Sequence, residues 1–281
     1  MKQRLLSFLM ALIAVIAFAG CSSNEKDAAT VLEEAQQKMT EVTSLQATMD
    51  MNVKMAMGTE EISTITTADI TTFREPLKMK LDVASYTESA PEQKTILQMY
   101  IQESENEITV FSNAGTGWVQ TTAEDNSLGQ FLVYENILRY LSAIDSPVNK
   151  GTEKIGDIST DRIVGTLKGE TMEQIIEESG VLSSAESVGI SEEQLKEMYS
   201  EIDGLPITLW IGEDGLVYQY ETDITKLIQV VMDKTIELIG ADNFDEDMNV
   251  SVQNASISAS CSNFNEAAEF EIPTEALEAA Q

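Results

Sequence analysis

The sequence predicts an α+β domain in which a curved antiparallel half-barrel sheet carries helices packed on its concave face. Three observations predict this fold class. Short segments of alternating apolar and polar residues follow one another from residue 47 to residue 120, joined by short polar turns as in an antiparallel meander. A second group of alternating segments lies after residue 160, with helical patterns between the two groups. Pro-, Gly- or Ser-rich linkers are absent, so residues 28–281 are expected to form one domain.

Composition excludes several classes of function. The chain has 281 residues, with 17 Lys and Arg against 48 Asp and Glu, a formal net charge of −31 and no His. A nucleic-acid partner is excluded because phosphate backbones need basic surface. Catalysis by His, the commonest general base, is excluded as well. Two Cys cannot form a disulfide framework or a four-thiolate zinc site, and we expect no metal and no cofactor.

The N-terminus predicts a lipid anchor. Lys2 and Arg4 precede an uncharged apolar run, which is too short and wrongly flanked for a permanent membrane span and is typical of a signal peptide over residues 1–20. The segment Phe18-Ala19-Gly20-Cys21 resembles a bacterial lipobox, in which the cysteine is acylated and becomes the first residue. We therefore expect lipidation at Cys21, a tether over residues 21–27, and a monomer anchored on the extracytoplasmic face of the cell membrane. The alternative is an ordinary signal peptide with an incidental cysteine.

The first elements of the domain follow from residue spacing. Thr30 and Glu33 form a capping-box pattern, and apolar residues then recur at helical spacing, so a helix is expected from Thr30 to about Ser44. A long strand should follow over 47–57, because its odd positions are apolar and its even positions mostly polar. Further strands are expected over 62–72, 77–83, 95–102, 107–112, 117–120, 161–167, 205–211, 216–220 and 250–261.

The remaining helices differ in their polar faces. A helix over 128–144, capped by Ser127, is apolar almost all round, which indicates cover on most sides. Helices are also expected over 172–179, over 195–202 after a Ser191 and Gln194 cap, and over 224–239, whereas 181–187 is expected to be a flexible insertion. Cys261 continues an alternating strand without basic neighbours, which favours a buried thiol over a reactive one. The acidic segment Asp242–Asp247 has the composition of a calcium loop without its central Gly, which favours a solvated loop.

The order of these elements resembles a known family. The segment Val42-Thr43-Ser44-Leu45-Gln46-Ala47 leads from the first helix directly into the long strand and the meander. A late Leu205-Pro206-Ile207-Thr208-Leu209-Trp210-Ile211 hairpin strand and a terminal Phe270-Glu271-Ile272-Pro273 complete the pattern. Together they resemble the lipoprotein-carrier superfamily of the LolA/LolB and LppX/LprG type. The resemblance implies a half-barrel capped by helices, an apolar cavity between them, and transport or sensing of a hydrophobic ligand.

Methionine supplies a physical argument for such a cavity. Met side chains are flexible and polarisable and adapt to ligands of varied shape. The residues expected to line a ligand site are Met49, Met51, Val53, Met55, Met57, Met79, Met99, Phe131 and Leu138. The alternative for this set is an ordinary Met-rich core.

Two functions therefore stay open. One is an anchored binding protein or carrier for a lipid or other hydrophobic molecule, and the other is a structural or interaction lipoprotein of the cell envelope with a filled interior. An internal cavity of about 300 Å³ or more favours the first. An enzyme is not expected, because the sequence has neither a Gly-rich phosphate loop nor a nucleophile–His pair.

Overall fold

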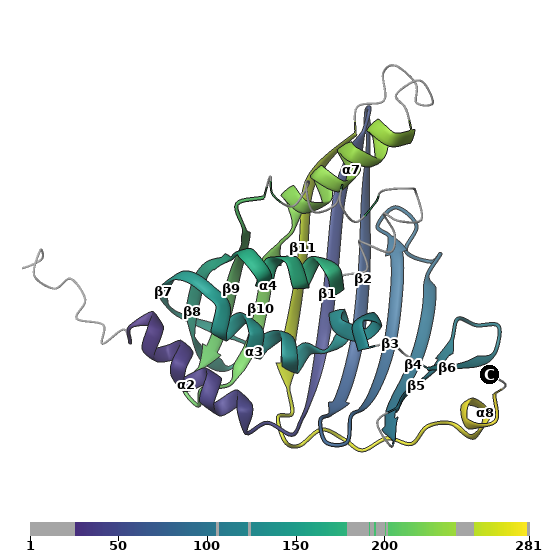
Figure 1. Ribbon diagram of the computed structural model, residues 1–281, viewed down its shortest axis with the longest axis horizontal. Helices are drawn as coiled ribbons and strands as arrows, with labels where there is room; N and C mark the ends of the chain where they lie inside the picture. Colours follow the sequence, from purple (N-terminus) through teal and green to yellow (C-terminus); the bar gives the residue numbers. More distant parts are fainter. Residues whose placement is uncertain are drawn as a thin grey trace, which may run out of the picture.

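The computed structural model describes residues 26–104, 107–122, 125–178, 191, 194, 200, 202–239 and 250–279. Its strands form one open antiparallel sheet of eleven strands in the order β6-β5-β4-β3-β2-β1-β11-β10-β9-β8-β7, with helices on one face (Figure 1). The predicted fold class is confirmed. The strands are β1 (Ser44–Met57), β2 (Glu60–Phe73), β3 (Lys78–Thr87), β4 (Thr95–Ser104), β5 (Glu107–Asn113), β6 (Trp118–Thr122), β7 (Ile144–Ile155), β8 (Ile158–Leu167), β9 (Leu205–Gly212), β10 (Val217–Asp223) and β11 (Val250–Ser262).

The two faces of the sheet differ in polarity, as the alternation of β1 predicts. Leu45 and Ala47 of β1 are buried on the concave side, opposite Ile70 and its neighbours on β2. The intervening positions face away from the helices and bond to polar partners. The Thr48 hydroxyl donates to Oδ1 of Asp69 at 2.8 Å, and the Thr67 hydroxyl donates to Oδ1 of Asp50 at 2.7 Å. One side of β1 therefore belongs to the core and the other to a polar outer surface.

Five described helices cover the concave face. They are α2 (Ala28–Thr40), the 3₁₀ helix η1 (Asp125–Phe131), α3 (Val133–Ala143), α4 (Gly169–Glu178) and α7 (Thr225–Ile239), whereas the short α8 (Thr274–Leu277) lies beside β6. Figure 1 shows α2, α3 and α4 stacked across the part of the sheet that β7 to β11 and β1 form, while α7 lies along β11. Every residue of the described core lies between Ala28 and Ala276, so the chain from Ser22 onwards contains this core whole.

The C-terminal segment supports the opposite face. After β11 it runs along the strand ends to α8, beside β6 (Figure 1). Phe270 and Ile272 pack there against a second apolar cluster built on Tyr100 and Phe111. The phenyl ring of Phe270 lies 5.9 Å from the ring of Tyr100. This segment shields aromatic side chains that point away from the helices.

Two predicted details are wrong, and one strand was not predicted. The helix expected over 128–144 is two helices, η1 and α3, because Leu132 between them has φ −78° and ψ 66°, and Ile144 already begins β7. The capping box at Thr30 does not form, since α2 begins earlier, after Asp27. β7 was not predicted, because it is an edge strand that contains a Pro and a Gly and two shifts of register against β8.

Other predictions hold or lie outside the described part. The Ser191 cap forms, with the Ser191 hydroxyl 3.1 Å from Oε1 of Gln194. The signal peptide with Cys21, the 181–187 insertion, residues 195–199 of the following helix, and Asp242–Asp247 lie outside the described residues. Among the described residues, no helix has the length and apolar character needed to cross a membrane.

Cys261 is buried, as predicted, on the concave side opposite Ala47. Burial raises the pKa of its thiol to about 12. At pH 8 only about one thiol in ten thousand is then ionised, and the thiolate is the reactive form.

We therefore expect iodoacetamide to leave Cys261 unmodified in the folded Ser22–Gln281 domain at pH 8. The same reagent should modify it rapidly in concentrated urea, where the pKa returns to its ordinary value near 8.5. Mass spectrometry of the two samples checks this. Equal modification in both would contradict the burial of this thiol.

Candidate functional site

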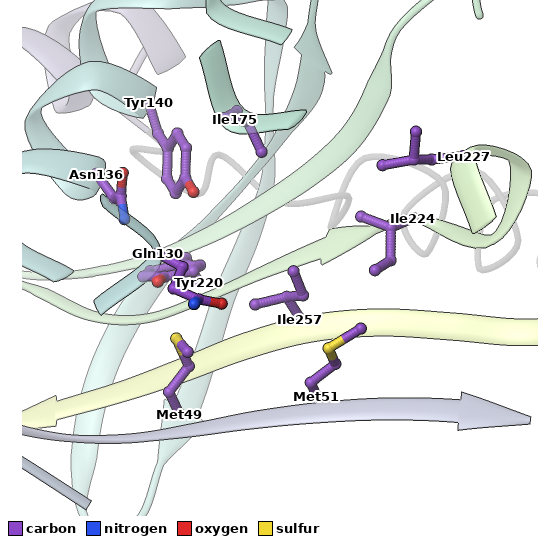
Figure 2. A pocket seen from close by; sticks show the side chains of 10 residues that line it. All are labelled: Met49, Met51, Gln130, Asn136, Tyr140, Ile175, Tyr220, Ile224, Leu227 and Ile257. Atoms are coloured by element: carbon purple, nitrogen blue, oxygen red, sulfur yellow. The ribbon is translucent and has the colours of Figure 1, made fainter. Parts of the chain in front are cut away.

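An apolar cavity lies between the sheet and its helical cover. Its volume is about 60 Å³. Figure 2 shows its walls, to which β1, η1, α3, α4, β10, α7 and β11 contribute. The ten lining residues are Met49, Met51, Gln130, Asn136, Tyr140, Ile175, Tyr220, Ile224, Leu227 and Ile257. The cavity therefore joins the centre of the sheet to several parts of its cover.

The floor of the cavity is made by neighbouring strands. Met49 and Met51 project from β1, and Ile257 of β11 stands directly opposite Met51 in the ladder. Ile224, which precedes α7, and Leu227 in its first turn are each 2% exposed and close one side. Flexible thioethers next to branched aliphatic side chains give a surface that can adapt to an apolar ligand.

Polar groups occupy another part of the wall. Asn136 of α3 is 5% exposed, and its Nδ2 donates to the carbonyl of Gly129 at 3.0 Å, which holds the start of α3 against η1. The rings of Tyr140 and Tyr220 meet edge to face at 5.2 Å. Burial raises the pKa of Tyr220 well above its ordinary value of 10, so its hydroxyl keeps its proton throughout the physiological range.

Of the predicted ligand residues, the structure brings only Met49 and Met51 to the cavity wall. Val53, Phe131 and Leu138 are partly buried and pack against the same core. The other four fall into two groups. Met79 and Met99 are buried in the core on β3 and β4, with 0% and 8% of their surface exposed, and Met55 and Met57 are half-buried toward the end of β1.

Sequence reasoning missed the polar part of the wall. Asn136 could have been found from the sequence, because it is an uncharged polar residue in a strongly apolar helical segment. It precedes Tyr140 by four residues, so the two share one face of the helix. Tyr220 could not have been found in this way, because an alternating strand accommodates Tyr on either face. Its inward direction depends on register with β11, where it stands opposite Ala259.

A larger hollow of about 490 Å³ lies elsewhere, near the start of α2. Its lining is half polar and includes Lys26, Glu34 and Asp161. These groups already have partners within the protein, since Lys26 pairs with Glu34 and Nδ2 of Asn149 lies 3.3 Å from Oδ1 of Asp161. In the described part of the chain no group of three His, Cys, Asp or Glu could hold a metal ion. The smaller apolar cavity is therefore the candidate site.

No protein-family model matches the sequence, and no curated protein matches it. Several solved structures are similar. Lipoprotein LppX from Mycobacterium tuberculosis has 16% identity and a TM-score of 0.46, with 86% of this chain and 98% of that chain covered. LprF from Mycobacterium bovis has 13% identity and a TM-score of 0.46, with 88% and 96% covered. A LolA superfamily protein from Nitrosomonas europaea has 8% identity and a TM-score of 0.25, with 88% and 96% covered.

Both types that the sequence resembles, the LppX type and the LolA type, are among these structures. All of these identities and TM-scores are low.

Met79 and Met51 provide a test of the cavity. Met79→Ala should lower the free energy of unfolding by about 2–5 kcal/mol, as is usual for a fully packed methionine. Met51→Ala should cost roughly half as much or less, because its side chain already borders empty space and loses fewer contacts. Urea unfolding of both variants measures this. Equal losses would mean that Met51 is packed like an ordinary core residue.

Proposed function

We propose that this protein is a membrane-anchored extracytoplasmic lipoprotein that binds a hydrophobic ligand in the cavity between its sheet and helices. The observation that carries the proposal is the cavity wall, in which apolar side chains from β1, β11, α4 and α7 surround empty space beside a few uncharged polar groups. Small-molecule sites in proteins have this composition. Binding, and not catalysis, is the role that this wall supports.

The first described residues are compatible with an anchor at Cys21. The Lys26 carbonyl accepts a hydrogen bond of 3.0 Å from Nδ2 of Asn149, and the Lys26 ammonium pairs with Glu34. Five peptide steps from Cys21 to Lys26 span at most about 18 Å. A lipid on Cys21 would therefore hold the start of α2 close to the membrane surface.

The size of the cavity limits the ligand that the closed arrangement can hold. At about 60 Å³ it is well below the roughly 300 Å³ at the low end of small-molecule sites. It holds a short apolar segment as it stands, and a longer ligand requires the helical cover to move away from the sheet.

The alternative is a structural or interaction lipoprotein of the envelope with a filled interior. The small volume of the cavity favours it, as does the complete burial of Met79, Leu81 and Ile101 on the concave side of β3 and β4. A charged side chain introduced at Met51 distinguishes the two functions, because a filled core and a ligand cavity respond differently to it.

The Ser22–Gln281 domain should bind an apolar fluorescent probe, and Met51→Glu should remain folded but bind it at least tenfold more weakly. Met51 is only half-buried, so a carboxylate at the end of this side chain can reach water outside the cavity, whereas in a filled core it costs several kcal/mol against a total stability of about 5–15 kcal/mol. Probe titration and thermal melting on the same samples measure both effects.

Asn52→Glu is the matched control, because it places the same charge on the next residue of β1, on the opposite face. It should leave melting and probe binding unchanged. Absence of probe binding by the unmodified domain, or unfolding of Met51→Glu, would support the filled interior. A folded Met51→Glu domain that binds the probe normally would show that the probe does not bind in this cavity, and would contradict the proposed function.

The anchor is tested separately. Cys21→Ser should abolish incorporation of radiolabelled palmitate and release the protein from the membrane fraction, because the two chains of a diacylglyceryl group hold a protein stably in the bilayer. Cys261→Ser is the control and should retain the label. Label that persists in Cys21→Ser would show that Cys21 is not the acylated residue.

A further inference from the structure

Two polar atoms of the cavity wall make no hydrogen bond to the described residues. Tyr220 is 1% exposed, and its hydroxyl makes no hydrogen bond to the described residues. Asn136 is 5% exposed, and its Oδ1 accepts none within the part of the chain that the structure describes. A polar group that is withdrawn from water without a new partner loses hydrogen bonds. Such groups beside an empty space indicate a hydrogen-bonding partner that the protein itself does not supply.

The described residues of this wall carry no charge. None of the ten described residues that line the cavity is charged, and the whole chain has a formal net charge of −31. A carboxylate or phosphate brought into this cavity would lose its hydration and meet no Lys or Arg among these residues. A cationic group would meet no carboxylate among them. The polar end of the cavity is therefore suited to an uncharged group.

The two kinds of wall are separated in space. Figure 2 shows Asn136, Tyr140, Gln130 and Tyr220 toward one side of the cavity, while Ile224 and Leu227 lie toward the other. A ligand that satisfies both ends has a polar head and an apolar tail.

From this separation we propose that the ligand is an uncharged amphiphile, such as an alcohol, amide or ester, with its head between Tyr220 and Asn136 and its tail toward Ile224 and Leu227. This inference rests on the proposed function and specifies the ligand class of the same cavity. The Tyr220 hydroxyl can donate to the head and Asn136 Oδ1 can accept from it, so an alcohol head satisfies both groups at once.

The test compares ligands that share one tail. 1-Octanol, octanoate and octyltrimethylammonium are each used at pH 8 to displace the fluorescent probe from the Ser22–Gln281 domain. We expect 1-octanol to bind at least tenfold more tightly than either ion, because both ions lose hydration without gaining a partner of opposite charge. If octanoate or octyltrimethylammonium binds as tightly as the alcohol, the inference fails and the proposed function stands. If none of the three displaces a bound probe, the inference fails too, and absence of probe binding contradicts the proposed function itself.

A second variant pair tests the position of the head. Tyr220→Phe should keep its fold, since it removes an unpaired hydroxyl, and should weaken binding of 1-octanol about five- to tenfold with no change for octyltrimethylammonium. Thr222→Val is the matched control. Thr222 lies two residues further along β10, and its buried hydroxyl has no partner in the described structure. Unlike Tyr220, Thr222 does not line the cavity. Equal binding of 1-octanol by both variants would show that the Tyr220 hydroxyl contacts water only, and would overturn the proposal.

Discussion

The pairing of β1 with β11 is the contact on which the rest of the structure depends. β1 begins the meander that runs to β6, and β11 ends the group that runs back through β10, β9 and β8 to β7. Their antiparallel ladder, from Gln46 opposite Ser262 to Met57 opposite Val250, is the only join between these two halves in the described sheet. Because side chains alternate along both strands, this one register decides that Met49, Met51 and Ile257 share a face. The floor of the cavity exists only when the two halves of the chain have met.

The helical cover determines what the floor can hold. Asn136 ties α3 to η1 through the Gly129 carbonyl, and Tyr140 of α3 meets Tyr220 of β10 edge to face. The cover is thus fixed to the sheet at the polar end of the cavity.

Most elements of this fold can be predicted from sequence because their apolar residues follow the period of a strand or a helix. β1 shows this most clearly, since its alternation predicted its end at Met57 and the direction of Thr48 and Asp50, while its start at Ser44 lies three residues before the predicted one. β7 could not be predicted, because an edge strand with one neighbour tolerates Pro147 and irregular register. The cavity wall was predicted only where it comes from β1. Tyr220 and Ile257 reach it through long-range pairing, and the pattern of a single strand contains no information on which distant strand stands beside it.

A hydrophobic, uncharged molecule should occupy the space between sheet and helices. Native mass spectrometry can detect it on the Ser22–Gln281 domain secreted from a bacterial host and purified without detergent. We expect a species heavier than the bare chain by one lipid-sized mass, which organic extraction releases as a neutral compound and which the folded Met51→Glu domain lacks. A folded, unmodified domain that shows only the mass of the bare chain, and takes up no neutral amphiphile when one is added, would contradict it.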